Sequence, residues 1–400
     1  MISLQNNSVV PAHSVLTWTK GGTTTSVRWR SENGTPPPKR MVVADDIMTA
    51  DAAYQLASKG TALLWLGDFQ NARQLLNALA RRVDANPRKR KGPKAPAAFA
   101  QAPPPAPPLS MTETFHRHRM AQAQRAHTLG MLMIPFDAGH VIPLRRAPDV
   151  RQACAEAYGT ADEPYAVSMR ELLGLIGAHE WRRKGLEIPA LQASIHPHYG
   201  VFAPLRSEYV ALVADAPLPS GCDLAFDIGT GTGVLAAVLA RRGVQRIVAT
   251  DRDPRALACA RENLARLKFA GRVQVVEVDL FPEGRAPLVV CNPPWVPGRA
   301  SSALERAVYD EEGRMLRGFI AGLAAHLTPG GEGWLILSDL AEHLGLRTRA
   351  ELEAAFAAAG LKVLGRMDAK PSHKKAADAA DPLHAARAAE VVSLWRLAPV

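Results

Sequence analysis

The fold of this 400-residue chain is decided by the sequence LAFDIGTGTG at residues 224–233, where an apolar strand pattern runs into glycines and opens a helix. Further strand patterns follow, separated by helical ones. Strands are expected at 223–228, 246–250, 273–278, 287–291, 333–338, 361–367 and 391–397. Helices are expected between them, at 233–242, 254–267, 312–327 and 348–359. This alternation predicts an α/β fold with a mostly parallel sheet that helices cover on both faces.

The glycine turn predicts a ligand site at the carboxyl edge of that sheet. Gly229, Gly231 and Gly233 permit a tight turn and let a ligand approach the main chain without a Cβ in the way. The spacing does not match the dinucleotide pattern G-x-G-x-x-G, because its last position is Val234. A carboxylate at Asp227 would repel a phosphate and attract an ammonium or sulfonium group. The turn therefore favours a ligand with a positive charge over a dinucleotide.

Acidic residues also end the next two expected strands. Asp251 stands where a carboxylate can accept hydrogen bonds from ribose hydroxyls. Asp279 stands where it can accept one from the exocyclic amine of an adenine, and Leu280 or Phe281 could cover the ring. Three acidic strand ends in register favour a nucleoside site over ordinary strand-end turns.

A second motif, NPPW at Asn292–Trp295, follows the expected strand at 287–291. An amide or exocyclic amino nitrogen is a poor nucleophile, because its lone pair is delocalised into a π system. The side-chain oxygen of Asn292 and the carbonyl of Pro293 can accept its N–H groups and orient it, while Trp295 offers a flat face for stacking. Proline suits such a loop because it fixes φ. The motif therefore favours a site that binds and orients a planar nitrogen.

Together the two motifs resemble class I S-adenosylmethionine-dependent methyltransferases, in the branch with an (N/D)-P-P-(Y/F/W) loop, over residues 196–367 and the last strand. The resemblance implies a Rossmann-like sheet of seven strands, the last antiparallel, and S-adenosyl-L-methionine as cofactor. It implies catalytic roles for Asn292, Pro293, Pro294 and Trp295. The cofactor contacts that it implies are Asp227, Gly229, Gly231, Gly233, Asp251, Arg252, Asp279, Leu280 and Asn292.

The resemblance leaves the methyl acceptor open. The DIGTGTG turn, the Val-Pro after NPPW and the acidic ERAVYDEEG stretch favour a protein glutamine amide, as in release-factor methyltransferases. The net charge of +10 favours an adenine-N6 or guanine-N2 amine of ribosomal or transfer RNA. A third alternative is a nucleic-acid-binding module that keeps the fold without turnover. A proline segment resembles one that precedes the first strand in these families, so Phe202 and Pro204, with Trp295, are expected to contact the substrate.

The N-terminal half predicts a separate organisation. We expect a disordered extension at 1–44, a helical segment at 45–83, a basic and proline-rich linker at 84–110, a helical substrate-recognition region at 111–195 and the methyltransferase domain at 196–400. The basic linker either contacts phosphates or is simply solvated.

Composition excludes several classes of protein. There is no apolar run of about 18 residues and no signal-peptide pattern, so we expect no membrane span and a cytoplasmic location. Four separate cysteines predict a reducing environment, and the pair His196 and His198 lacks a third metal ligand. We expect a monomer that binds no metal and acts on a macromolecule, either a release factor or ribosomal protein or a structured RNA.

Overall fold

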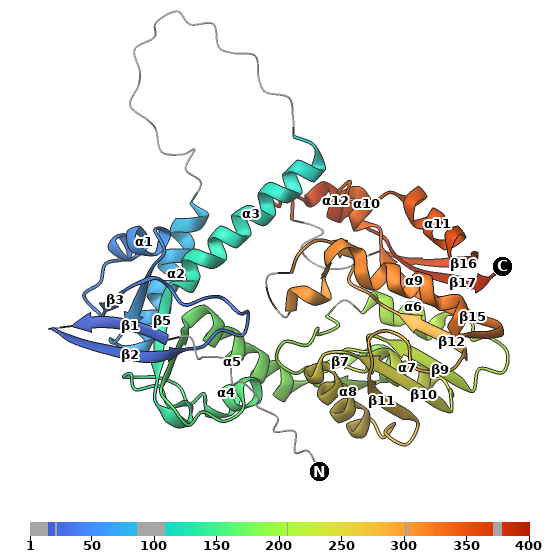
Figure 1. The fold of residues 1–400 in the computed structure, drawn as a ribbon, viewed down its shortest axis with the longest axis horizontal. Coiled ribbons are helices and arrows are strands. Elements are labelled where there is room, and N and C mark those ends of the chain that lie inside the picture. Colours follow the sequence, from blue (N-terminus) through green and yellow to red (C-terminus); the bar gives the residue numbers. More distant parts are fainter. Residues whose placement is uncertain are drawn as a thin grey trace, which may run out of the picture. The chain divides into compact units, whose positions relative to one another are not determined.

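The computed structural model describes residues 15–20, 22–85, 109–205, 207–300, 302, 304–370 and 378–400. The chain divides into two compact units, shown as a ribbon in Figure 1. The first contains Met1–Ala100 and Gln122–Ile176, and the second contains Gln101–Ala121 and Gly177–Val400. The second unit thus begins earlier than the expected boundary at 196, and it also includes residues that we had assigned to the substrate-recognition region.

The first unit contradicts the prediction of a helical N-terminal half behind a disordered extension. It has a six-stranded mixed sheet in the order β1-β2-β6-β5-β4-β3. Its strands are β1 (Val15–Lys20), β2 (Thr23–Trp29), β3 (Arg40–Ala44), β4 (Thr61–Trp65), β5 (Leu132–Phe136) and β6 (Tyr165–Ser168). Its helices are α1 (Ala50–Ser58), α2 (Phe69–Asp84) and α4 (Arg151–Tyr158), while α3 (Met111–Gly130) and α5 (Met169–Lys184) are divided between the units.

The reason for this error lies in the strand sequences. The strand β2 reads TTTSVRW, and threonine and valine favour extended backbone even where the segment is polar enough to suggest disorder. The strand β4 is buried at all five positions, so its short apolar run does not alternate and is hard to tell from a helix segment. Residues 1–14 of the expected extension and 86–108 of the expected linker lie outside the described residues.

The second unit confirms the predicted seven-stranded sheet, in the order β11-β10-β9-β12-β15-β17-β16. Neighbouring strands from β11 to β15 are parallel, and β17 is antiparallel to both β15 and β16. The strands are β9 (Leu224–Ile228), β10 (Arg246–Asp251), β11 (Val273–Glu277), β12 (Ala286–Cys291), β15 (Leu327–Ser338), β16 (Leu361–Ala369) and β17 (Val392–Pro399). Short pairs form between β7 (Leu186–Ile188) and β8 (Ala193–Ile195), and between β13 (Val296–Pro297) and β14 (Tyr309–Asp310).

Helices cover both faces of this sheet and bury a separate core on each. They are α6 (Glu208–Asp215), α7 (Val234–Arg241), α8 (Pro254–Arg266), α9 (Arg314–His326), α10 (Leu340–His343), α11 (Arg349–Ala358) and α12 (His384–Ala389). Side chains alternate along β9, so Ala225 packs in the core under α6, α7 and α8, and Phe226 packs in the core under α9 and α11. This packing fixes the strand ends that build the site.

The long segment between the last two strands contains regular structure of its own. The strand β16 extends to Ala369, and α12 (His384–Ala389) forms before β17 begins. Residues 371–377 lie outside the described residues.

Candidate functional site

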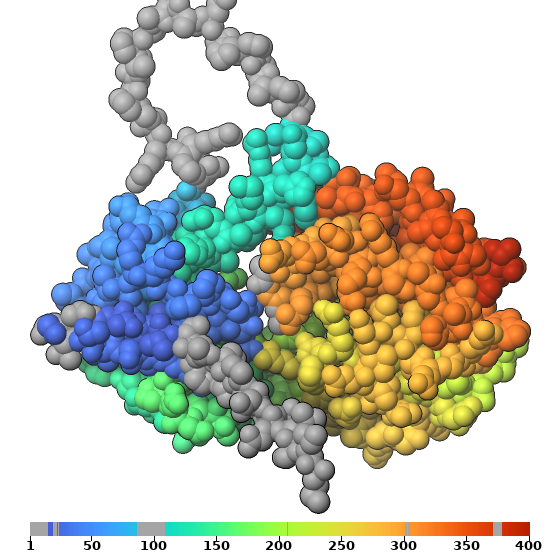
Figure 2. Space-filling model, viewed as in Figure 1, coloured from blue at the N-terminus to red at the C-terminus, as the bar shows by residue number. Residues whose placement is uncertain are grey.

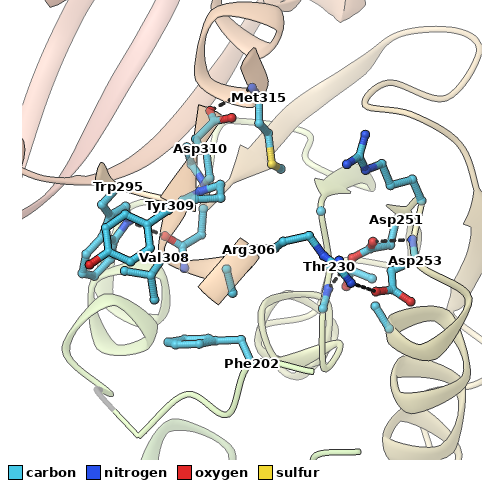
Figure 3. Close-up of a pocket in the computed structure, with 18 of the residues that line it drawn as sticks. Phe202, Thr230, Asp251, Asp253, Trp295, Arg306, Val308, Tyr309, Asp310 and Met315 are labelled. Carbon is cyan, nitrogen blue, oxygen red and sulfur yellow. Dashed lines mark hydrogen bonds and ion pairs between the residues drawn. The ribbon is translucent and has the colours of Figure 1, made fainter. Parts of the chain in front are cut away.

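A cavity of about 1010 Å³ lies at the carboxyl edge of the seven-stranded sheet. In Figure 3, Thr230, Asp251 and Asp253 stand on one side of it, and Trp295, Val308 and Tyr309 on the other. The first group follows β9 and β10, and the second follows β12 and leads into β14. The structure therefore brings the glycine turn and the NPPW motif into a single site.

Two of the three glycines face this cavity. Gly229 and Gly231 line it with φ of 71° and 55°, in the left-handed region that favours glycine. Gly233 does not line it. A Cβ there would lie 3.2 Å from the Cα and Cβ of Ala260, so the absent side chain of Gly233 lets α7 pack closely on α8.

Asp227 also lies behind the cavity and not in its wall. It is 1% exposed, and its Oδ2 accepts hydrogen bonds from the Thr230 hydroxyl at 2.6 Å and the Ala236 amide at 3.1 Å. Burial raises the pKa of this carboxyl to about 6. Asp227 therefore shapes the turn from beneath, and direct contact with a ligand is not required for that role.

Asp251 does face the cavity. Its Oδ2 accepts the Gly231 amide at 3.0 Å, and its Oδ1 accepts the Asp253 amide at 3.0 Å. Burial raises its pKa. The Arg252 amide is a third backbone donor to this carboxylate. Because a carboxylate offers about four acceptor sites, Asp251 keeps room for a further donor. The neighbouring Arg252 is exposed and also lines the cavity.

The predicted adenine contacts Asp279 and Leu280 also line the cavity. Arg314, at the start of α9, donates two hydrogen bonds to the Asp279 carboxylate at 2.9 and 3.2 Å, which lowers the pKa of Asp279. Leu280 lines the cavity at a φ of 73°, held by a 2.7 Å hydrogen bond from the Thr250 hydroxyl to its carbonyl. Of the two candidates for covering an adenine, Leu280 is therefore the one in place. Phe281 instead stacks on His326 with 4.2 Å between ring centroids.

All four residues of NPPW line the cavity, and two of them are joined by a bond that the sequence did not suggest. The indole Nε1 of Trp295 donates to Asn292 Oδ1 at 2.9 Å. An indole N–H can only donate, so the contact fixes which end of the Asn292 carboxamide is the oxygen. The Trp295 ring also meets Tyr209 edge to face, with 6.4 Å between centroids. Trp295 thus orients the Asn292 carboxamide as well as lining the cavity.

Several cavity residues were missed by the sequence reasoning, and four of them bear on the geometry of the site. They are Arg306, Tyr309, Asp310 and Met315. Asp310 accepts hydrogen bonds from the Met315 and Leu316 amides at 2.8 and 3.1 Å, so it satisfies two backbone donors in the first turn of α9. Figure 3 shows Arg306 reaching across the cavity toward Asp253, at 3.8 Å. Nothing in local sequence pairs these two residues, which lie far apart in the chain.

Of the two residues expected from the proline segment to contact the substrate, only one lines the cavity. Phe202 lines the cavity, as Figure 3 shows, whereas Pro204 does not. Across the described residues, no group of three histidine, cysteine or acidic side chains could hold a metal ion. No helix in the described part of the chain is long and apolar enough to cross a bilayer.

Comparison with known proteins adds to this geometry. Residues 194–362 match the family model of the methyltransferase small domain. The chain is 33% identical over 180 residues to release factor glutamine methyltransferase of Cereibacter sphaeroides, covering 41% of this chain and 63% of the relative. It is 31% identical over 174 residues to tRNA1(Val) (adenine(37)-N6)-methyltransferase of Shewanella amazonensis, covering 39% of this chain and 73% of the relative.

A shorter match is more similar in sequence. Over 69 residues the chain is 52% identical to ribosomal protein L11 methyltransferase of Pelotomaculum thermopropionicum, covering 17% of this chain and 22% of the relative. The chain therefore spans less than two thirds of the L11 and release factor relatives.

Proposed function

The chain belongs to the methyltransferase small-domain family, and from the geometry of its cavity we propose that it transfers a methyl group from S-adenosylmethionine to a planar nitrogen. The observation that supports this proposal is the placement of Asp251 and Asn292 in one cavity. Asp251 lies beside the glycine turn, and Asn292 is the first residue of the NPPW motif, which we propose binds the methyl acceptor.

The cavity residues fit this cofactor. The Met315 side chain lies over Gly229, close to where a Cβ would be, and a methionine side chain is flexible enough to move aside for a ligand. Asp251 would accept the ribose hydroxyls, and Asp279 with Leu280 would hold the adenine. When bound, S-adenosylmethionine supplies an electrophilic methyl group, so the protein contributes mainly position.

The acceptor half has the chemistry that a weak nucleophile needs. Asn292 Oδ1 keeps one lone pair beyond the bond from Trp295, and the Pro293 carbonyl supplies another acceptor. These two would bind the N–H groups of a planar amine and turn its nitrogen toward the methyl group. No general base is required, because the proton can leave after the transfer.

For the acceptor itself we propose a protein glutamine amide first and an exocyclic base amine second. The first is supported by the sequence around both motifs and by the likeness to a release factor glutamine methyltransferase. The second is supported by the net charge of +10 and by the likeness to a tRNA adenine-N6 methyltransferase. The role of the first unit in substrate recognition, a monomeric state and a cytoplasmic location stay predictions.

The test is methyl transfer from labelled S-adenosylmethionine to separate release-factor, ribosomal-protein, ribosomal RNA and transfer RNA fractions. Label in protein or in RNA identifies the acceptor class, and no label in any fraction contradicts the proposal. Asn292→Ala should abolish turnover while the Kd for S-adenosylhomocysteine stays nearly unchanged. If that variant loses cofactor binding instead, the NPPW loop is structural and the assigned role is wrong.

A further inference from the structure

The first turns of α3 belong to the second unit, although they precede the matched family region by about seventy residues of sequence. Figure 1 shows this part of α3 beside α12 and α10, and Figure 2 shows the same residues, in cyan, against the orange and red surface. Phe115 is 5% exposed there and packs with Leu344, Leu383 and Ala386. This contact adds an element to the sheet domain that its motifs do not reveal.

One face of the helix makes the contacts. Thr112, Phe115 and Arg119 are three and four residues apart, which places them on the same side of a helix. The Thr112 hydroxyl donates to the Leu344 carbonyl at 2.9 Å. Phe115 lies in the same cluster as Val296, the residue directly after NPPW. The face is therefore anchored beside the acceptor motif.

Arg119 makes three contacts through one guanidinium, two of them with residues that line the cavity. It donates to the Arg299 carbonyl at 2.7 Å, forms an ion pair with Glu305 at 3.2 Å, and lies 3.9 Å from the centroid of the Tyr309 ring. These residues span the loop between β13 and β14. A planar guanidinium can donate to two acceptors and stack on a ring at the same time, which a lysine ammonium could not reproduce.

Residues of this loop form much of the cavity wall on the same side as NPPW, where we propose that the methyl acceptor binds. Arg299, Arg306, Val308 and Tyr309 all line it. Its ends are joined by hydrogen bonds from the Val296 amide to the Val308 carbonyl and from the Gly298 amide to the Asp310 carbonyl, both 3.1 Å. Closing a loop costs conformational entropy, and a residue that bridges its beginning, middle and end offsets part of that cost.

We propose that Arg119 is a positioning residue for the methyl acceptor: it holds Arg299, Glu305 and Tyr309 in the arrangement that completes the cavity wall beside NPPW. This proposal rests on the proposed function for its effect on turnover, but not for its effect on the loop. Arg119 does not line the cavity, so it acts through Tyr309 and its neighbours and not on the substrate.

The test compares Arg119→Ala and Arg119→Lys with Arg117→Ala in the full chain. Arg117 is an exposed arginine on the same helix and serves as the matched control. Hydrogen exchange at the Val296 and Gly298 amides should become at least about tenfold faster in Arg119→Ala, because charged hydrogen bonds and a cation–π contact are lost. The exchange rates of Arg119→Lys should lie between those of the wild type and Arg119→Ala, and those of Arg117→Ala should match the wild type.

Turnover separates positioning from general destabilisation. With the fraction that the wild type labels, Arg119→Ala should raise the half-saturating concentration about fivefold or more, while the Kd for S-adenosylhomocysteine stays within about twofold. Unchanged exchange at both amides would overturn the proposal, and so would an equal loss of cofactor binding. If the wild type labels no fraction, the proposed function fails, and the exchange result still decides whether Arg119 holds the loop.

Discussion

Asp227→Asn should raise stability at neutral pH, and the gain should shrink on acidification. The folded-state pKa of Asp227 is about 6, against 3.8 for the unfolded chain, because the side chain is buried beneath the glycine turn. A raised carboxyl pKa means that ionisation costs stability. The cost is absent below pH 3.8, grows between 3.8 and 6, and is complete above 6.

The shift sets the size of the effect. About two pKa units at 1.36 kcal/mol each give about 3 kcal/mol at pH 7.5, and the same linkage relation leaves about 1.5 kcal/mol at pH 5. Solvent screening barely reduces this, since the side chain is 1% exposed. Asparagine keeps an oxygen to accept from the Thr230 hydroxyl and the Ala236 amide. Its new N–H₂ group adds a penalty that is the same at both pH values, so the pH dependence is the diagnostic quantity.

The assay is urea unfolding of the wild type and the variant at pH 7.5 and pH 5. The variant should gain about 1.5 kcal/mol relative to the wild type between pH 5 and pH 7.5. Asp223→Asn is the control, because it removes a carboxylate that is 64% exposed directly before the same strand and so relieves no burial. A difference between Asp227→Asn and wild type that is independent of pH would refute the reasoning.

Three further changes test the site and its supports. Trp295→Phe keeps a ring but removes the donor to Asn292, so kcat should fall roughly 2- to 13-fold, for about 0.5–1.5 kcal/mol, with the Kd for S-adenosylhomocysteine unchanged by calorimetry. Asp251→Ala should instead weaken the binding of S-adenosylhomocysteine by roughly 1–3 kcal/mol. An unchanged Kd would show that Asp251 does not contact the cofactor. Burial alone would raise the pKa of Glu262, but hydrogen bonds from His198, Arg182 and Arg266 lower it to about 2. Its stabilisation is therefore present above pH 4.5 and lost toward pH 2, on the order of 1–3 kcal/mol, and urea unfolding of Glu262→Gln should lack this acid-side loss.

The seven-stranded sheet was predictable because its central strands β9, β12 and β15 are largely buried on both faces and its helices begin and end with clear signals. Asp253 and Pro254, for example, open α8 as a cap and a first-turn proline. Each predicted strand therefore appears within a few residues of its place, apart from the earlier start of β15. The first unit was not predictable in the same way, since β2 is polar and β4 is a short apolar run without alternation.

The residues of the candidate site were also predicted only in part. Sequence analysis identified the cavity residues of the glycine turn and of NPPW because each group forms a short continuous motif. Asp227 and Gly233 belong to the motif, but the structure places them behind the wall, where they support the turn. Arg306 and Tyr309 were missed because their roles depend on Asp253 and Arg119, which lie far away in sequence. Spacing within a segment carries no information about such partners.

The bond from Trp295 to Asn292 bears on how many methyl groups one acceptor receives. It leaves the carboxamide oxygen one lone pair, which together with the Pro293 carbonyl matches the two hydrogens of a primary amine. A nitrogen that has been alkylated once keeps a single hydrogen and would leave one of these oxygens unsatisfied. We therefore expect a monomethylated product, and mass spectrometry of the modified fraction would reveal any second addition.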